Sequence, residues 1–145
     1  MQYTTTDFVE AIDREQTLRA TTYPKIVAKK QKQWNQQGEN VMALTSEITC
    51  SQRIQNTLLT DCKFELGKPQ GYIYEAHHEI FRELQRELRM RKQYYPRWVG
   101  WGRMDATVAE MELSVWEALT KYYHETYCPA APWRKPLTRK EKSHG

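Results

Sequence analysis

Residues 86–99, RELRMRKQYYPRWV, decide the fold because a related stretch occurs earlier in the chain. Residues 14–27 read REQTLRATTYPKIV, and the two stretches align without a gap. Arg, Glu, Arg, Tyr, Pro and Val are identical at matched positions, and the copies are separated by about half of the 145-residue chain. A repeat on this scale indicates that one supersecondary unit occurs twice.

The Tyr-Pro pair in each copy, Tyr23-Pro24 and Tyr95-Pro96, has two interpretations. A proline inside a helix costs about 3 kcal/mol, so its presence in both copies favours a bend that shapes the fold. In the preferred interpretation, each copy is a long kinked helix that forms a hairpin with the helix after it, and the two hairpins bury their apolar faces against each other. In the alternative, each tyrosine ends one helix and each proline begins the next.

Caps and a modest apolar pattern predict the first two helices. Thr5 or Thr6 is expected to cap the first helix and Gly38 to end it, with the second beginning near Glu39. Their apolar positions are Phe8, Ala11, Ile12 and Leu18 in the first and Val41, Leu44, Ile48 and Leu58 in the second. Because polar residues interrupt the second pattern, residues 42–50 are alternatively a short strand.

The third and fourth helices have clearer patterns. Residues 64–71 hold two glycines and a proline and are expected to form the loop before the third helix. Gly102 is a suitable end for the third helix and Asp105 a suitable cap for the fourth. The predicted buried positions are Ile73, Ile80, Leu84, Leu88, Tyr95 and Trp98 in the third helix and Val108, Met111, Val115, Leu119 and Tyr122 in the fourth. Such spacing is typical of amphipathic helices.

The sequence therefore predicts an all-α fold with one helical domain over residues 1–128. The domain is expected to be a four-helix arrangement of two pseudo-repeated helical hairpins, about residues 5–63 and 72–128. Three prolines follow the fourth helix and cannot continue it. Residues 129–145 are therefore expected to form a proline-containing basic C-terminal tail.

Composition limits the class of protein. Hydrophobic residues make up 39%, charged residues 28% and aromatic residues 12% of the chain, which is too polar for a membrane protein and too aromatic for a disordered one. The N-terminus lacks a basic leader followed by an apolar stretch, and three cysteines do not make a disulfide framework. We therefore expect a cytoplasmic protein that does not contact a membrane.

Cationic and aromatic side chains alternate between residues 86 and 105. Cations on one helix face can contact phosphates, and exposed aromatic rings can stack on the bases of a single strand. The residues predicted to bind nucleic acid or another partner, here called the basic strip, are Arg86, Arg89, Lys92, Arg97, Trp101 and Arg103. Trp98 follows the apolar pattern and is expected in the core, whereas Trp101 stands between two glycines and is expected to be exposed.

Two other interpretations of the basic strip remain open. Glu79, Glu83 and Glu87 stand three or four residues from several arginines, which favours a solvated face that neutralises itself through ion pairs. Alternatively, the strip binds an acidic protein partner. Blocks of opposite charge alternate along the chain, with residues 82–103 mainly basic and residues 105–125 mainly acidic.

Candidates for catalysis and metal binding are sparse. There is no GxSxG motif and no glycine-rich phosphate loop, and an HExxH motif fails because arginine stands at position 82. His77 is expected to be a core histidine with a satisfied ring. One metal alternative is a Cys₃His zinc set made of Cys50, Cys62, His124 and Cys128. The sequence otherwise predicts no catalytic residues, no metal, no cofactor and no enzyme activity.

Several short elements occur together in the second half of the chain. They are Met90-Arg91, Tyr95 to Val99, Gly102 to Met104 and Ala109-Glu110. This combination, which covers about 35 residues, resembles a pattern in small helical proteins encoded by phages and prophages. The resemblance implies an origin in a mobile element and no particular chemistry.

Together these features predict a non-enzymatic accessory protein of a phage or mobile element. It is expected to bind nucleic acid or a nucleoprotein complex through the basic strip. One alternative is an inhibitor of a host defence complex, similar to an anti-CRISPR protein, that acts by protein–protein contact. The other is a structural homodimer in which the acidic fourth helix meets the basic third helix of a second copy.

Overall fold

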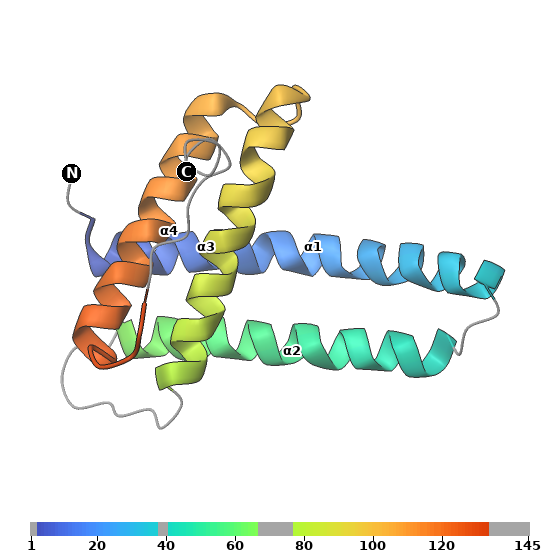
Figure 1. Cartoon of the computed structure of the whole chain (residues 1–145), viewed down its shortest axis with the longest axis horizontal. Helices are drawn as coiled ribbons and strands as arrows, with labels where there is room; N and C mark the ends of the chain where they lie inside the picture. The colour runs from blue at the N-terminus through green and yellow to red at the C-terminus, as the bar shows by residue number, and fades with distance from the viewer. Residues whose placement is uncertain (1–2, 38–40, 67–76, 134–145) are drawn as a thin grey trace.

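A computed structural model describes residues 3–37, 41–66 and 77–133. These residues form four helices and no strand, and the helices are α1 (Thr5–Gln37), α2 (Val41–Leu66), α3 (His77–Gly100) and α4 (Ala106–Tyr127) (Figure 1). The predicted all-α fold with four helices is confirmed. The alternative of a short strand at residues 42–50 is wrong, because α2 runs through them.

Several predictions lie outside the described residues. They concern Gly38, Glu39, residues 67–71 of the expected loop, Ile73, the tail from residue 134, and the side chains of Val41, Leu44 and Ile48. The first part of the expected loop is described and is helical, because α2 continues to Leu66.

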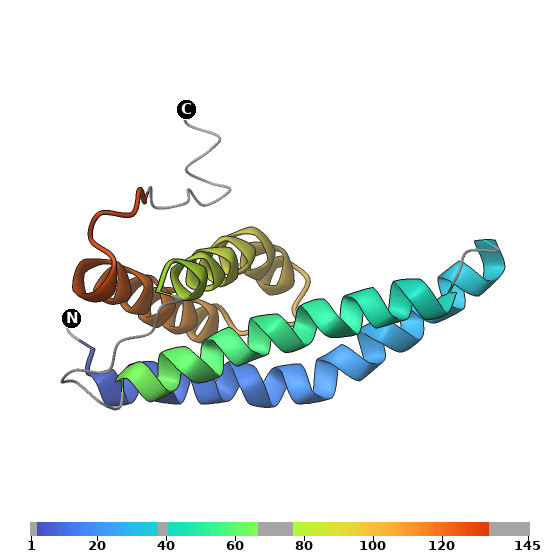
Figure 2. The same ribbon diagram turned by 90° about the horizontal axis from the view of Figure 1, so that it is seen from below.

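The helices pack as two antiparallel pairs in two layers. α1 lies beside α2 and α3 lies beside α4, and the second pair crosses the first steeply (Figure 1). Figure 2 shows that α1 and α2 extend beyond the crossing as an arm that α3 and α4 do not cover. None of the described helices combines the length and apolar character that a bilayer crossing needs.

The prolines of both repeated stretches lie inside helices. Pro24 is within α1 and Pro96 is within α3. The long-helix interpretation is therefore confirmed, and the alternative in which each tyrosine ends a helix is wrong. α1 bends along its length (Figure 2), as expected where a proline removes a backbone hydrogen bond.

Side-chain caps fix the starts of α1 and α4. Thr4, rather than the predicted Thr5 or Thr6, pairs reciprocally with Asp7. Its N–H donates to Asp7 Oδ2 at 2.8 Å, and the Asp7 N–H donates to Thr4 Oγ1 at 3.2 Å. Asp105 caps α4 as predicted, because its carboxylate accepts from the first free N–H groups of that helix.

A glycine turn ends α3. The Gly102 N–H donates to the Val99 carbonyl at 3.1 Å, and the Arg103 N–H donates to the Trp98 carbonyl at 2.8 Å. These two bonds form a Schellman motif, and Gly102 has the positive φ of 71° that the motif requires. The turn directs the chain back so that α4 packs against α3.

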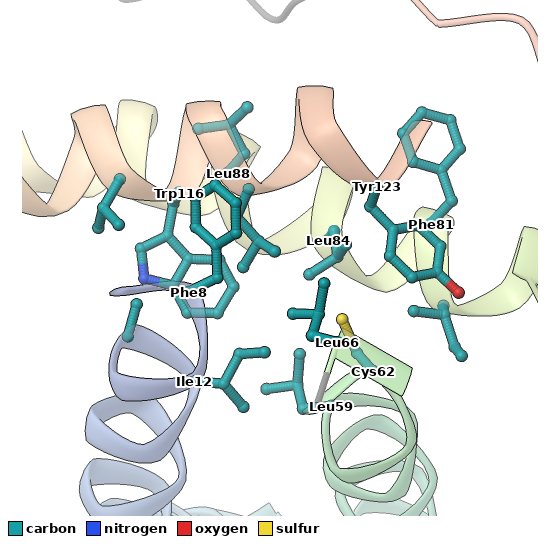
Figure 3. Close-up of a cluster of buried hydrophobic side chains, with 14 of the residues drawn as sticks. Phe8, Ile12, Leu59, Cys62, Leu66, Phe81, Leu84, Leu88, Trp116 and Tyr123 are labelled. Atoms are coloured by element: carbon teal, nitrogen blue, oxygen red, sulfur yellow. The ribbon is translucent and has the colours of Figure 1, made fainter. Parts of the chain in front are cut away.

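All four helices contribute to one apolar core (Figure 3). Its largest contributors are Phe8, Ile12, Leu59, Cys62, Leu66, Ile80, Phe81, Leu84, Leu88, Trp116, Leu119 and Tyr123. Burying one large apolar side chain contributes roughly 1.5–3 kcal/mol before entropy costs. The α3 pattern is confirmed at Ile80, Leu84, Leu88 and Tyr95, all of which are buried.

Four predicted core residues are exposed instead. The exposed fractions are 56% for Leu18, 37% for Trp98, 45% for Val108 and 50% for Met111. Val108 and Met111 lie on other sides of α4 than the buried Ala109 and Trp116. Trp98 packs against the rings of Tyr94 and Tyr95 on its own helix. In α1 the buried Arg19, rather than Leu18, points inward.

Candidate functional site

The outward face of α3 is mainly basic. Arg82 and Arg89 are exposed on this helix, and Arg97 is partly exposed. Glu83 and Glu87, which stand between the arginines in the sequence, are only 4% and 5% exposed. Two of the three carboxylates of α3 therefore face the interior, and only that of Glu79, near its first turn, is exposed with the arginines.

Four residues of the basic strip reach the surface. Arg89, Trp101 and Arg103 are exposed and Arg97 is partly exposed. The exposed fraction of Trp101 is 62%, as the sequence predicted. These residues lie along α3 and the turn that follows it.

The other two residues of the strip are held by carboxylates. Arg86 Nε lies 2.5 Å from Glu83 Oε1, and its Nη2 lies 2.7 Å from Glu87 Oε1, which leaves the side chain 30% exposed. Lys92 is 4% exposed, and its Nζ lies 3.3 Å from Glu117 Oε2 on α4. Lys92 therefore connects the two helices of one pair and does not share the exposed surface.

Aromatic rings and arginines alternate at the C-terminal end of α3. The rings of Tyr94 and Trp98 stack with centroids 6.2 Å apart and planes 22° apart. The Arg97 guanidinium lies 5.7 Å from the Tyr94 ring centroid. In the following turn, the Arg103 guanidinium lies 5.4 Å from the Trp101 ring centroid. Each unit combines a flat apolar surface with a positive charge.

A buried network of ion pairs connects α1 and α3, and the sequence did not predict it. Arg19 Nε lies 3.1 Å from Glu15 Oε1, and Arg19 also pairs with Glu87 across the layers. Arg91 pairs with Glu87 on its own helix, and its Nη2 lies 2.7 Å from Glu15 Oε2. The Arg91 guanidinium also lies 4.0 Å from the Trp116 ring centroid.

The four charged members of this network occupy matched positions of the two repeated stretches. Glu15 corresponds to Glu87, and Arg19 corresponds to Arg91. Each arginine pairs with the glutamate four residues before it and with the glutamate of the other helix. The self-pairing predicted for Glu87 and Arg91 is therefore confirmed, but it lies in a buried contact between layers and not on a solvated face.

Burial and charge act in opposite directions on the two inward glutamates of α3. Burial alone would raise the pKa of Glu87, but Arg91, Arg19 and Arg86 outweigh this effect and hold its pKa below the ordinary value. For Glu83, burial outweighs the attraction of Arg86 and raises the pKa. Glu87 is thus the anion on which three arginines converge.

A second polar cluster lies where α2, α3 and α4 meet. His77 Nε2 lies 2.6 Å from Oε2 of Glu65, a fully buried residue. The rings of Tyr123 and Tyr127 flank His77. Burial and then Glu65 raise the pKa of Tyr123, and the same causes raise the pKa of Tyr127 to about 12. His77 is a largely enclosed residue with a partner, as predicted.

The residues of the alternative zinc set do not converge. Cys50 is exposed, whereas Cys62 and Cys128 are buried. The ring of His124 is engaged elsewhere, with Nε2 2.6 Å from the Ala131 carbonyl oxygen. Among the residues that the structure describes, no group of three or more histidine, cysteine or acidic side chains gathers as a metal site.

A groove of about 560 Å³ lies between α1 and α2, beside the ion-pair network. Its polar lining consists of Gln16, Arg19, Gln31, Thr49, Gln52, Arg53 and Asn56. Arg19 lines this groove and shares the Glu87 carboxylate with Arg86 of α3. The groove therefore begins next to the basic helix.

Comparison with known proteins supplies no relative. No family model, curated protein or solved structure matches the chain. The candidate surface is thus defined by its own geometry, in which exposed arginines and aromatic rings share one helix and the turn after it. Such a surface suits an anionic, partly planar ligand.

Proposed function

We propose that the protein binds nucleic acid through the outward face of α3 and the turn after it. The observation that carries the proposal is the inward orientation of Glu83 and Glu87, whose carboxylates would otherwise neutralise the arginines around them. Removing these anions from the surface leaves a row of cations along the helix. The protein needs no catalytic step for this role.

The proposed contact set differs from the basic strip in two ways. Lys92 is excluded because it is buried against Glu117, and Arg86 contributes only in part because two glutamates hold it. Arg82, an exposed residue on the same helix, is added. The proposed phosphate contacts are therefore Arg82, Arg89, Arg97 and Arg103.

The origin of the protein, its location in the cell and its other candidate partners are also proposals. We infer a cytoplasmic accessory protein of a phage or other mobile element, from the resemblance of residues 90–110 to phage-encoded proteins. Inhibition of a host nucleoprotein complex fits the same surface, because a positive patch can also meet a negative patch of a protein. A homodimer would bring the exposed acidic side of α4 to the arginines of a second copy.

The two helical pairs are further inferred to be pseudo-repeats. Two observations support this view: the matched prolines each lie inside the first helix of a pair, and the matched glutamates and arginines pair reciprocally. A duplicated hairpin whose copies pack face to face would place equivalent residues opposite one another in this way. The tail from residue 134 is proposed to add positive charge to the bound state.

The test is a binding titration with labelled DNA and RNA at several salt concentrations. Affinity is expected to fall steeply as salt rises, and Arg89→Ala is expected to weaken binding for all sequences and to lower the salt slope by about 1. Lys121→Ala is the matched control, because Lys121 is an exposed cation on α4.

Four outcomes would count against the proposal. An affinity that does not change with salt would show that the α3 face does not bind nucleic acid. An equal loss of affinity in the Lys121→Ala control would show the same. Tight binding to a protein complex with no affinity for free nucleic acid would favour the inhibitor. A mass of twice 17.3 kDa in solution, lost on Arg89→Ala, would favour the homodimer.

A further inference from the structure

The C-terminal end of α3 has a feature that phosphate contacts do not require. Trp98 and Trp101 are both large aromatic residues, with exposed fractions of 37% and 62%. They stand three residues apart in the sequence, at the end of one helix, and exposed apolar surface that is contiguous is typical of binding sites. Their exposure therefore calls for a ligand with an apolar surface of its own.

The fold does not account for a tryptophan at position 101. The Schellman turn depends on Gly102, which has the positive φ, and on two backbone hydrogen bonds. Trp101 contributes only its backbone to this turn, and its ring lies outside the apolar core. A polar residue would serve the turn equally well, so the exposed ring is available to a ligand.

The charge next to each ring defines the ligand further. Arg103 lies against the ring of Trp101, and Arg97 lies against Tyr94, which stacks on Trp98. A ligand that fits both units must present a flat ring and an anion at short, repeated intervals. Nucleotides of a strand whose bases are not paired have this chemistry.

A duplex fits the same place poorly. Its base faces are stacked on one another, so a protein surface meets only base edges and phosphates. Arg82 and Arg97 are fifteen residues apart on α3, or about 22 Å at 1.5 Å per residue. A single strand can follow this row of arginines and turn its last bases onto the aromatic rings.

We propose that this end of α3 is a stacking site for single-stranded nucleic acid. Trp101 receives one unpaired base, the stack of Tyr94 and Trp98 receives another, and Arg97 and Arg103 contact the phosphates between them. The inference rests on the proposed function of α3 and adds the class of ligand. DNA and RNA share the chemistry that the rings recognise.

The test compares four labelled oligonucleotides of equal length at low salt: single-stranded DNA, single-stranded RNA, duplex DNA, and single-stranded DNA in which the bases are replaced by abasic sites. The full-length chain is expected to bind the first two at least tenfold more tightly than the last two. Trp101→Ala is expected to reduce this preference, because the stack of Tyr94 and Trp98 remains, and to bind the abasic strand as the wild type does. Met111→Ala, another exposed apolar residue of the described surface, is the matched control.

The outcomes separate the two proposals. If the abasic strand or the duplex binds as tightly as the natural single strand, and Arg89→Ala still weakens binding, the stacking site is wrong while phosphate binding stands. If no oligonucleotide binds at low salt, both proposals are wrong. An equal effect of Trp101→Ala and Met111→Ala would also overturn the stacking site.

Discussion

Arg91 illustrates how a charged residue becomes part of an interior. Its guanidinium contacts the Trp116 ring and pairs with Glu15 and Glu87, and the residue is 6% exposed. Desolvating a guanidinium is costly, and only the combined charges and hydrogen bonds of its partners offset that cost. Truncating it would leave Glu15 and Glu87 with one shared cation, Arg19, in place of two.

Arg91→Ala is expected to lower the free energy of unfolding by about 3–5 kcal/mol, the usual result of removing one partner from a buried ion pair. Arg82→Ala, which removes an exposed arginine of the same helix, is expected to change it by less than about 0.5 kcal/mol. Urea denaturation of both variants measures the difference. Similar stabilities would mean that the network does not support the fold.

Glu87 should make stability depend on pH in the acid range. Because its folded pKa lies below its ordinary value of 4.5, its contribution is present above that pH and is lost as pH falls through the folded pKa. Glu87→Gln is expected to be less stable near neutral pH and to have a flatter acid limb in denaturation at a series of pH values. Glu83, whose folded pKa is raised, has the opposite dependence, so Glu83→Gln should not flatten that limb.

Gly100, at the end of α3, and Gly102, in the turn after it, have different roles. Gly100 ends the helix with ordinary dihedral angles, and open space surrounds the position that a Cβ would occupy. Gly102 has similar space but a φ of 71°, which strains any residue with a Cβ. The difference between them is therefore one of backbone conformation alone.

Gly100→Ala is expected to stabilise the protein by roughly 0.5 kcal/mol, because alanine loses less entropy than glycine in a helix. Gly102→Ala is expected to destabilise it by about 1 kcal/mol through left-handed strain. Thermal denaturation of the pair provides the comparison. If Gly102→Ala does not lower the stability, the turn tolerates an ordinary residue.

Periodicity predicted some elements better than others, for physical reasons. The buried positions predicted at Ile80, Leu84 and Leu88 of α3 were correct, because the apolar residues of this helix are few and regularly spaced. On α4, apolar residues occur on several sides, so the pattern chose Val108 and Met111 while the helix buried Ala109 and Trp116. Which side of α4 is buried depends on the helices that pack against it. The apolar pattern of α4 alone does not contain that information.

The sequence did not predict which charged side chains are buried between the two layers. The sequence indicated a solvated basic face, and Arg89, Trp101 and Arg103 are indeed exposed. The inward positions of Arg19, Glu87 and Arg91 follow from the steep crossing of the two layers, which brings matched residues of the repeat together. No local pattern reports a contact between residues about 70 positions apart.

The α1–α2 arm extends beyond the crossing of the two layers (Figure 2), so any rotation at the crossing would displace the tip of the arm. The core and the ion-pair network hold the N-terminal part of α1, while its C-terminal part runs beyond the second layer (Figure 2). The helix continues from Arg19, the last α1 residue of the network, to Gln37, which is about 27 Å at 1.5 Å per residue. At that length, a rotation of about 10° at the crossing would move the tip of the arm by roughly 4–5 Å.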